Sequence, residues 1–277
     1  MVAFKTGPIL LLLSLCVAGV FSDEAQDAWA SKQRRIKGDN SGRPSKFSGR
    51  IVGGTELKNA LPYQLSLRES GNHICGASII SAFHALTAAH CQSPPSEISK
   101  LTLLAGAVQR SDPNGIIFQV NNVTNHPRFD LRNFANDISI LHVTSSFLNY
   151  PNLAVIPLVS ELYKLKVNSV AAVSGWGLTA ADSMLAPTLR TVRIPITSMA
   201  TCIAQWSPVR IAKTAICAGH PGRDSCNGDS GGPLVQDGQQ IGLVSWGADQ
   251  CGSAYPGIYT YVGNKAMRTF IQENSGV

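Results

Sequence analysis

The segment Gly228–Pro233 places one serine, Ser230, in a turn made almost entirely of small residues. Glycines around a turn serine leave its hydroxyl exposed and let backbone N–H groups approach a bound carbonyl closely. A serine hydroxyl is a weak nucleophile near neutral pH and needs an adjacent base. Imidazole suits this task because it changes charge near physiological pH, and His90 is our candidate. These residues predict acyl transfer to water through an ester on Ser230.

A carboxylate, Asp137, stands between His90 and Ser230 in the chain and precedes the apolar segment 138–141. In a Ser-His-Asp triad, the carboxylate accepts a hydrogen bond from the second imidazole nitrogen, which fixes the tautomer and stabilises the cation. We expect Asp137 to act in this way, and the N–H groups of Gly228 and Ser230 to form the oxyanion hole. His90 is one of six histidines and Asn-Asp pairs usually mark turns, so the interpretation depends on the combination.

The elements that must position these residues are short apolar segments separated by Gly, Pro, Asn or Ser. They are 63–67, 77–80, 101–104, 116–120, 138–143, 170–174, 240–245 and 257–262. Segments of this length and spacing predict an all-β domain, and periodicity alone does not choose between a sandwich and a barrel. Residues 265–273 have helical composition and predict a C-terminal helix.

Seven short motifs occur in a fixed order along the chain. They are Ile51–Gly54, Ala88–Cys91, Asp137–Ile138, Ser174–Gly177, the Gly228–Pro233 turn, Ser245–Gly247 and Pro256–Tyr259. In these motifs, the chain resembles the chymotrypsin/trypsin family of serine endopeptidases, and within it insect-type secreted trypsins with three disulfides. The resemblance covers residue 51 to near the C-terminus. It implies two six-stranded antiparallel β-barrels with a C-terminal helix, and a crossover between the barrels near residues 150–170.

The N-terminal region has the pattern of an export signal. Lys5 precedes an apolar run over residues 9–20, which is typical of a secretory signal peptide and shorter than the roughly 20 residues that span a bilayer. A buried core helix is the alternative. We expect residues 1–22 to be the signal peptide, 23–50 a polar propeptide that cannot bury enough surface to fold alone, and 51–277 the protease domain. The mature protein would be secreted, extracellular and without a membrane anchor.

Net charge argues against a nucleic-acid partner. Residues 1–50 carry a net +4 of the total +6, which leaves +2 for residues 51–277, too little for a basic groove. We expect a monomer that needs no cofactor and no metal. Ala107 stands where the resembled family places its first calcium ligand, so we expect no calcium site. The expected partners are protein or peptide substrates, an activating protease and protein inhibitors.

Arg50 and Ile51 form a candidate activation site. The resemblance implies that a protease cuts after Arg50, and that the new α-amine of Ile51 turns inward to pair with Asp229. This buried ion pair would form before the oxyanion hole takes its working shape. The alternative is that Arg50 is only an exposed linker residue.

The resemblance also implies a preference for basic substrates. Asp224, six residues before Ser230, matches the base of the family's specificity pocket, where a carboxylate pairs with a long cationic side chain. Gly247 and Gly257 match the pocket walls, so cleavage after Arg or Lys is expected. Gln250 appears in place of a rim glycine in a segment one residue longer than the trypsin pattern, which leaves catalytic efficiency open.

Other functions remain as alternatives. Asp224 could be a solvated loop charge beside Arg223, and the enzyme could then have chymotrypsin-like or elastase-like preference. A catalytically silent homologue acting as a binding protein would require loss of a triad residue or an oxyanion glycine, and none is missing.

Six cysteines follow Cys16, which lies in the predicted signal peptide. An even number in an exported chain predicts three disulfides, and six cysteines allow 15 connectivities. The resemblance implies the pairs Cys75–Cys91, Cys202–Cys217 and Cys226–Cys251. Asn122 begins an Asn-x-Thr sequence, so it is a candidate glycosylation site in an exported protein.

Overall fold

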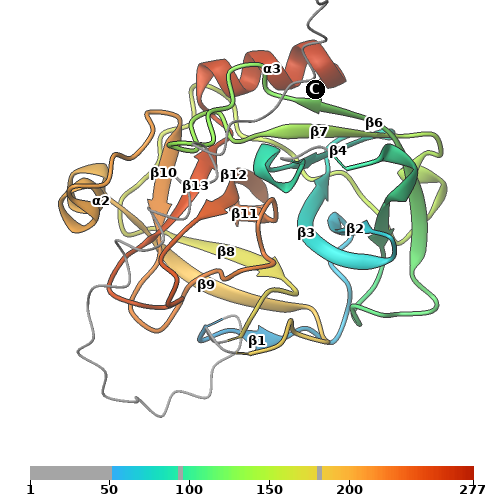
Figure 1. Cartoon of the computed structure of the whole chain (residues 1–277), viewed down its shortest axis with the longest axis horizontal. Helices are drawn as coiled ribbons and strands as arrows, with labels where there is room; N and C mark the ends of the chain where they lie inside the picture. Colours follow the sequence, from blue (N-terminus) through green and yellow to red (C-terminus); the bar gives the residue numbers. More distant parts are fainter. Residues whose placement is uncertain (1–51, 93–95, 180–182) are drawn as a thin grey trace, which may run out of the picture.

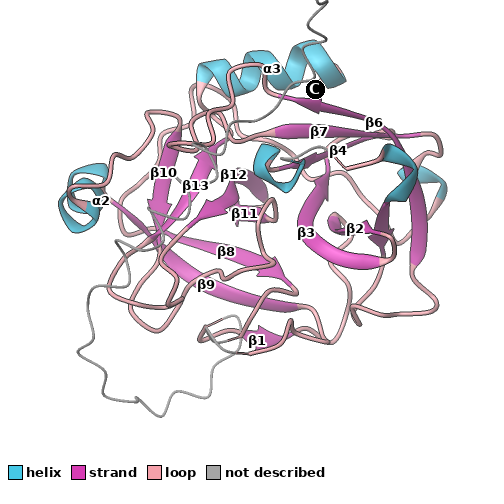
Figure 2. Ribbon diagram, in the orientation of Figure 1, coloured by secondary structure: helices cyan, strands magenta, loops and turns pink. Residues whose placement is uncertain are grey.

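The computed structural model describes residues 52–92, 96–179 and 183–277. Two β-barrels lie side by side, with short helices around them (Figures 1 and 2). The predicted signal peptide, the predicted propeptide and the Arg50–Ile51 activation site lie outside the described residues. Within the described ranges, no helix is both long enough and apolar enough to cross a membrane.

The first barrel is closed and its strand order is β2-β3-β4-β7-β6-β5. Its strands are β2 (Gln64–Glu69), β3 (Asn72–Ile79), β4 (His84–Thr87), β5 (Leu101–Ala105), β6 (Ile116–Asn125) and β7 (Ser139–Val143). The short 3-10 helices η1 (Ala89–Gln92) and η2 (Ile98–Lys100) lie between β4 and β5, and η3 (Phe147–Asn149) follows β7. Side chains alternate along a strand, so Leu65 and Leu67 on β2 both point inward. They pack with Phe118 and Leu141 in the barrel core.

The second barrel contains six strands in the order β9-β10-β13-β12-β11-β8, closed by pairing of β8 with β9. They are β8 (Val170–Gly175), β9 (Arg190–Thr197), β10 (Ala215–Ala218), β11 (Pro233–Gln236), β12 (Gln239–Trp246) and β13 (Gly257–Tyr261). The two-residue strand β1 (Thr55–Glu56) pairs with the edge of β9, and helix α2 (Met199–Trp206) precedes β10. The prediction of two six-stranded antiparallel barrels is confirmed, and the crossover runs between η3 and β8.

The C-terminal helix α3 (Lys265–Ser275) confirms the prediction for this segment. It begins where the Asn264 side chain accepts a hydrogen bond from the Ala266 N–H, and ends at Gly276, whose φ is 75°. Both are the expected chemistry of helix ends. Met267, Phe270 and Ile271, spaced three and four residues apart, bury one face of the helix in a core cluster that includes residues of both barrels. Burial of each side chain stabilises the packing by about 1.5–3 kcal/mol.

Buried polar contacts join the two barrels. The Ser78 hydroxyl of the first barrel donates to Gln240 Oε1 of the second at 2.7 Å. The Ser174 hydroxyl donates to Gln64 Oε1 at 2.6 Å in the opposite sense. Because a buried polar atom without a partner costs free energy, these pairs favour one relative position of the barrels. That position decides whether groups from the two barrels can meet.

Candidate active site

Ser230 lies in the turn before β11, and the neighbouring backbone holds the turn from both barrels. The Ser230 carbonyl accepts from the Gly76 N–H of β3 at 2.8 Å, and the Gly231 N–H donates to the Val244 carbonyl at 2.8 Å. Gly231 has a φ of 75°, and a Cβ at this position would collide with Thr87 Oγ1. The turn therefore requires glycine here, and it fixes the backbone that carries the serine hydroxyl.

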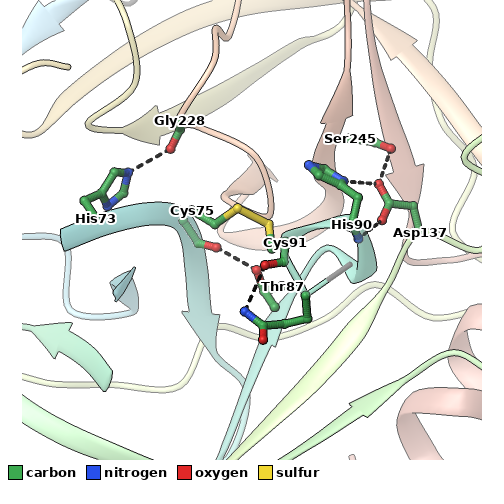
Figure 3. The surroundings of a disulfide bond; sticks show 10 residues. His73, Cys75, Thr87, His90, Cys91, Asp137, Gly228 and Ser245 are labelled. Atoms are coloured by element: carbon green, nitrogen blue, oxygen red, sulfur yellow. Dashed lines mark hydrogen bonds and ion pairs between the residues drawn. A yellow bond between two sulfur atoms is a disulfide. The ribbon is translucent and has the colours of Figure 1, made fainter. Parts of the chain in front are cut away.

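His90 and Asp137 meet at the ends of paired strands, since His90 follows β4 in η1 and Asp137 precedes β7. The distance from His90 Nδ1 to Asp137 Oδ2 is 2.7 Å, and the His90 backbone N–H donates to Oδ1 at 2.9 Å (Figure 3). Because a carboxylate only accepts, Nδ1 carries the proton and Nε2 is left as a base. The Ser245 hydroxyl donates to Asp137 Oδ2 at 2.5 Å, which satisfies the buried carboxylate further.

One cleft brings His90 and Ser230 together. Its lining consists of His90, Phe134, Ser225–Asn227, Ser230, Val244–Asp249 and Cys251. Within the described residues, no hydrogen bond joins the imidazole to the Ser230 hydroxyl. Catalytic hydrogen bonds are commonly long before substrate binds and tighten in the complex. The arrangement therefore has a base and a nucleophile facing one site.

The backbone N–H groups of Gly228 and Ser230 belong to peptides whose carbonyl oxygens, those of Asn227 and Asp229, accept hydrogen bonds. The Leu178 N–H donates to the Asn227 carbonyl at 2.7 Å, and the Asp229 carbonyl accepts from the N–H three residues later at 2.8 Å. In a trans peptide, N–H and C=O point in opposite directions, so the N–H groups of Gly228 and Ser230 face the other side. In the described part of the chain, neither N–H donates to another protein group. Both N–H groups therefore remain available as hydrogen-bond donors.

A buried histidine braces the same turn from behind. His73 Nε2 lies 2.8 Å from the Gly228 carbonyl, and Nδ1 lies 2.7 Å from the Ser66 hydroxyl (Figure 3 shows the first contact). Burial lowers the pKa of His73 to about 4, so the ring is neutral at pH 7. A neutral ring donates from one nitrogen only, here from Nε2 to the carbonyl and with Nδ1 accepting from Ser66.

The Asp229 carboxylate is fully buried beneath the turn. Gly177 donates its N–H to Oδ1 at 2.8 Å and Cys226 to Oδ2 at 3.0 Å. A Cβ on Gly177 would lie 2.5 Å from the carboxyl carbon, so only glycine fits. Desolvation raises the pKa of Asp229 to about 6 despite both hydrogen bonds. Among the described residues, no cationic group pairs with it, although an ionised buried carboxylate gains most from such a partner.

Asp224 is buried, and it directly precedes Ser225, which lines the cleft. Its carboxylate accepts from the Ser225 N–H at 2.8 Å and faces the Gly252 N–H at 3.5 Å. Desolvation raises the pKa of Asp224 to about 7. A Cβ on Gly257 would lie 2.7 Å from Asp224 Oδ1, so any side chain there would cover the carboxylate. The lack of one leaves the carboxylate uncovered on the side of Gly257.

Two glycines, Gly247 and Gly257, lie next to each other close to a disulfide bond. A Cβ on Gly247 would meet only the Gly257 Cα, at 4.0 Å, so the two glycines face each other. The disulfide Cys226–Cys251 links the segment before Ser230 to the loop after β12. That loop contributes Asp249 to the lining, whereas Gln250 does not line the cleft.

The other disulfides are Cys75–Cys91 and Cys202–Cys217, the pairs that the resemblance implies. Cys75, His90 and Cys91 have potential ligand atoms within 4.8 Å of one another. Both sulfurs belong to the disulfide, so they are not the thiolates that bind metals. Asn122 is exposed on β6, and its Oδ1 accepts from the Val123 N–H.

Three residues at the site had no role in the sequence interpretation. Ser245 supports Asp137 from the second barrel, His73 braces Gly228, and the Phe134 ring lies 5.5 Å from the His90 ring between ring centres. Ser245 belongs to the Ser245–Gly247 motif, so the sequence marked its position but did not indicate its contact with Asp137. His73 and Phe134 have no local signature, because their partners are distant in sequence.

Comparison with known proteins gives the same family as the motifs. The family model described as Trypsin matches residues 51–268. Trypsin alpha of Drosophila melanogaster is 38% identical over 221 residues, which are 78% of this chain and 85% of that protein. Trypsin delta of the same fly is 36% identical over 234 residues, 83% of this chain and 90% of that protein. Trypsin alpha-4 of Lucilia cuprina is 35% identical over 234 residues, which are 83% of this chain and 89% of that protein. The chain therefore belongs to the Trypsin family and is a trypsin-like serine endopeptidase homologue.

Proposed function

We propose that this protein is a secreted endopeptidase that cleaves peptide bonds after Arg or Lys and is made as a zymogen. The observation that carries the proposal is one cleft with three chemical parts. The imidazole of His90, held by Asp137, faces it from the first barrel. Ser230 faces it from the second barrel, and the buried carboxylate of Asp224 stands directly before Ser225 of the lining. The three disulfides fit an oxidising, extracellular compartment.

In the proposed reaction, His90 Nε2 takes the proton of the Ser230 hydroxyl as its oxygen attacks the substrate carbonyl. The N–H groups of Gly228 and Ser230 stabilise the developing oxyanion. The imidazolium, stabilised by Asp137, then protonates the leaving amine. This leaves an ester on Ser230, which water hydrolyses by the same steps in reverse order. The substrate's cationic side chain would pair with Asp224 through charge-assisted hydrogen bonds.

A panel of amide substrates that differ only at the residue before the cleaved bond tests this proposal. Activated protein should hydrolyse Arg and Lys substrates with kcat/KM at least about 10²-fold above Phe and Ala substrates, because an unpaired buried charge disfavours neutral side chains by several kcal/mol. A preference for Phe or Ala substrates would refute the proposed Arg/Lys specificity but not the endopeptidase activity. No turnover of any substrate, together with no labelling by a fluorophosphonate, would favour the silent homologue.

The zymogen proposal rests on Asp229. Its buried carboxylate lies directly before Ser230 and has no cationic partner among the described residues. An α-amine released at Ile51 would supply that charge. Pairing would hold Asp229 ionised beneath the turn, and the turn carries the N–H groups of the oxyanion hole. Cleavage after Arg50 would thus control the geometry of Gly228 and Ser230.

Replacing Arg50 by glutamine should therefore give a folded, secreted and inactive zymogen. We expect kcat/KM to fall by at least about 10²–10³-fold after treatment with an activating trypsin, the loss associated with a missing oxyanion donor. N-terminal sequencing measures cleavage after residue 50, and an Arg-substrate assay measures the gain of activity. Arg50→Lys is the matched control, since it keeps a basic cleavage site and should still be activated. Full activity of Arg50→Gln without an Ile51 N-terminus would contradict the mechanism.

A further inference from the structure

A pair of histidines lies on the first barrel, away from the catalytic cleft. His84 begins β4, and His142 is the fourth residue of β7. The two strands are antiparallel, and the register places these histidines directly opposite each other. Both side chains are half-buried, so one side of the pair is open to solvent. Figure 1 shows β4 beside β7.

The backbone brings the two rings unusually close. The Val143 N–H donates to the Phe83 carbonyl at 3.1 Å, so the adjacent His84–His142 pair is the non-hydrogen-bonded kind, in which opposing side chains are nearest. The ring centres are 4.8 Å apart and the ring planes make an angle of 79°.

One nitrogen of each ring is already held by a hydroxyl. His84 Nδ1 lies 2.7 Å from Ser81 Oγ, and His142 Nε2 lies 3.1 Å from Thr124 Oγ1. In the described structure, neither of the remaining nitrogens, His84 Nε2 and His142 Nδ1, has a hydrogen-bond partner. A ring with one nitrogen held and the other available is the usual state of a metal-binding histidine, whose second nitrogen is oriented by a neighbour.

The spacing of the rings fits a shared metal ion. With metal–nitrogen bonds of about 2.0–2.1 Å, each ring centre lies roughly 3.2 Å from the ion. Two such rings are then about 4.5 Å apart at a right angle and about 5.2 Å apart at the tetrahedral angle. The observed separation of 4.8 Å falls between these limits. We propose that His84 and His142 bind one divalent transition-metal ion, Zn²⁺ or Cu²⁺, through His84 Nε2 and His142 Nδ1.

The surroundings favour this class of ion. Imidazole suits Zn²⁺ and Cu²⁺, whereas Ca²⁺ and Mg²⁺ prefer oxygen ligands. Metal binding requires neutral imidazole, and burial lowers the pKa of both histidines, with His84 lowering that of His142 further. Both rings are therefore ready to bind at neutral pH. Water completes the coordination on the solvent side.

The site is placed on the strands that carry the catalytic pair. Three residues beyond His84, β4 ends at Thr87 and leads into His90, and β7 starts immediately after Ile138, which follows Asp137. An ion bound by both histidines would link β4 and β7 at the end of the strand pair that is remote from His90 and Asp137. The binding itself does not depend on proteolysis, so it is measured without a substrate.

The test uses the full-length protein after treatment with EDTA. We expect calorimetry to show one Zn²⁺ bound per chain, and electron paramagnetic resonance of an equimolar Cu²⁺ complex to show two coordinated imidazole nitrogens. His84→Gln and His142→Gln should each weaken Zn²⁺ binding at least about tenfold, as expected when a coordinating group is lost. Ca²⁺ should not bind at this pair.

Two matched histidine variants locate the ion. His220→Gln changes another surface histidine, and His90→Gln removes the imidazole of the catalytic cleft; both should keep Zn²⁺ affinity within about twofold. Thermal unfolding in EDTA checks that each variant folds. If one of the two pair variants does not fold, Zn²⁺ binding by the other tests the proposal. The proposal is overturned if wild-type protein binds no Zn²⁺, if both pair variants bind as wild type does, or if His90→Gln abolishes binding.

Discussion

Ser230→Ala should lower kcat/KM for an Arg substrate by about 10⁶-fold, the scale of loss when the nucleophile of this type of triad is removed. The fold should be unchanged, because the turn is held by backbone contacts of Ser230 and Gly231 that alanine preserves. Affinity for benzamidine, a small cation that would bind at Asp224, should also stay within about twofold. Stopped assays with pure protein and benzamidine titrations measure the two effects.

Ser145→Ala is the matched control for this experiment. Ser145 is exposed in the turn after β7 and lies outside the cleft, so both kcat/KM and fluorophosphonate labelling should remain at the wild-type level. Labelling of the Ser230→Ala protein at another serine, with retained turnover, would show that the nucleophile has been misassigned.

Asp224→Asn should have the second largest effect, confined to basic substrates. Removing one partner of a buried charge pair costs about 2–5 kcal/mol, so kcat/KM for Arg and Lys substrates should fall by about 10²–10⁴-fold. The rate for a Phe substrate should change little, since that side chain gains nothing from the carboxylate. Asp249→Asn is the control, because Asp249 is a carboxylate that lines the cleft. Equal losses in the two variants would contradict the assignment of Asp224.

The ionisation of Asp224 gives the same prediction a second readout. Burial raises the pKa of Asp224 to about 7. The carboxyl is therefore increasingly neutral below that pH, and a cation binds the ionised form. Benzamidine affinity should rise about tenfold per pH unit well below the pKa and level off above it, with a proton released on binding. In Asp224→Asn, this dependence should disappear.

The fold could be predicted mainly where local signals are strong. The predicted apolar segments became strands, and the helical composition of 265–273 became most of α3. Short or mixed elements were not singled out. Strand β10 has four residues, and β9 alternates buried positions with partly buried or exposed ones, with Arg190 buried and Arg193 exposed. Helix α2 has only eight residues and depends on its Ser198 cap. Such elements gain stability from tertiary partners more than from their own sequence.

The choice of barrel over sandwich came from the resemblance, because alternating patterns serve both architectures. Closure is a property of pairings between distant strands, such as β2 with β5 and β8 with β9. These strands are far apart in the chain, so no local sequence pattern indicates that they pair.

Residue types and their spacing along the chain already predict the reacting groups: a serine in a glycine-rich turn, a histidine and an aspartate in a fixed order, and a carboxylate six residues before Ser230. Residue type and short spacing dictate intrinsic reactivity and the turns that expose it. Only the tertiary structure decided that Ser245 donates to Asp137, that burial shifts the pKa of Asp224, and that His84 faces His142. These features depend on how strands and barrels pack, which sets distance and dielectric surroundings between groups remote along the chain.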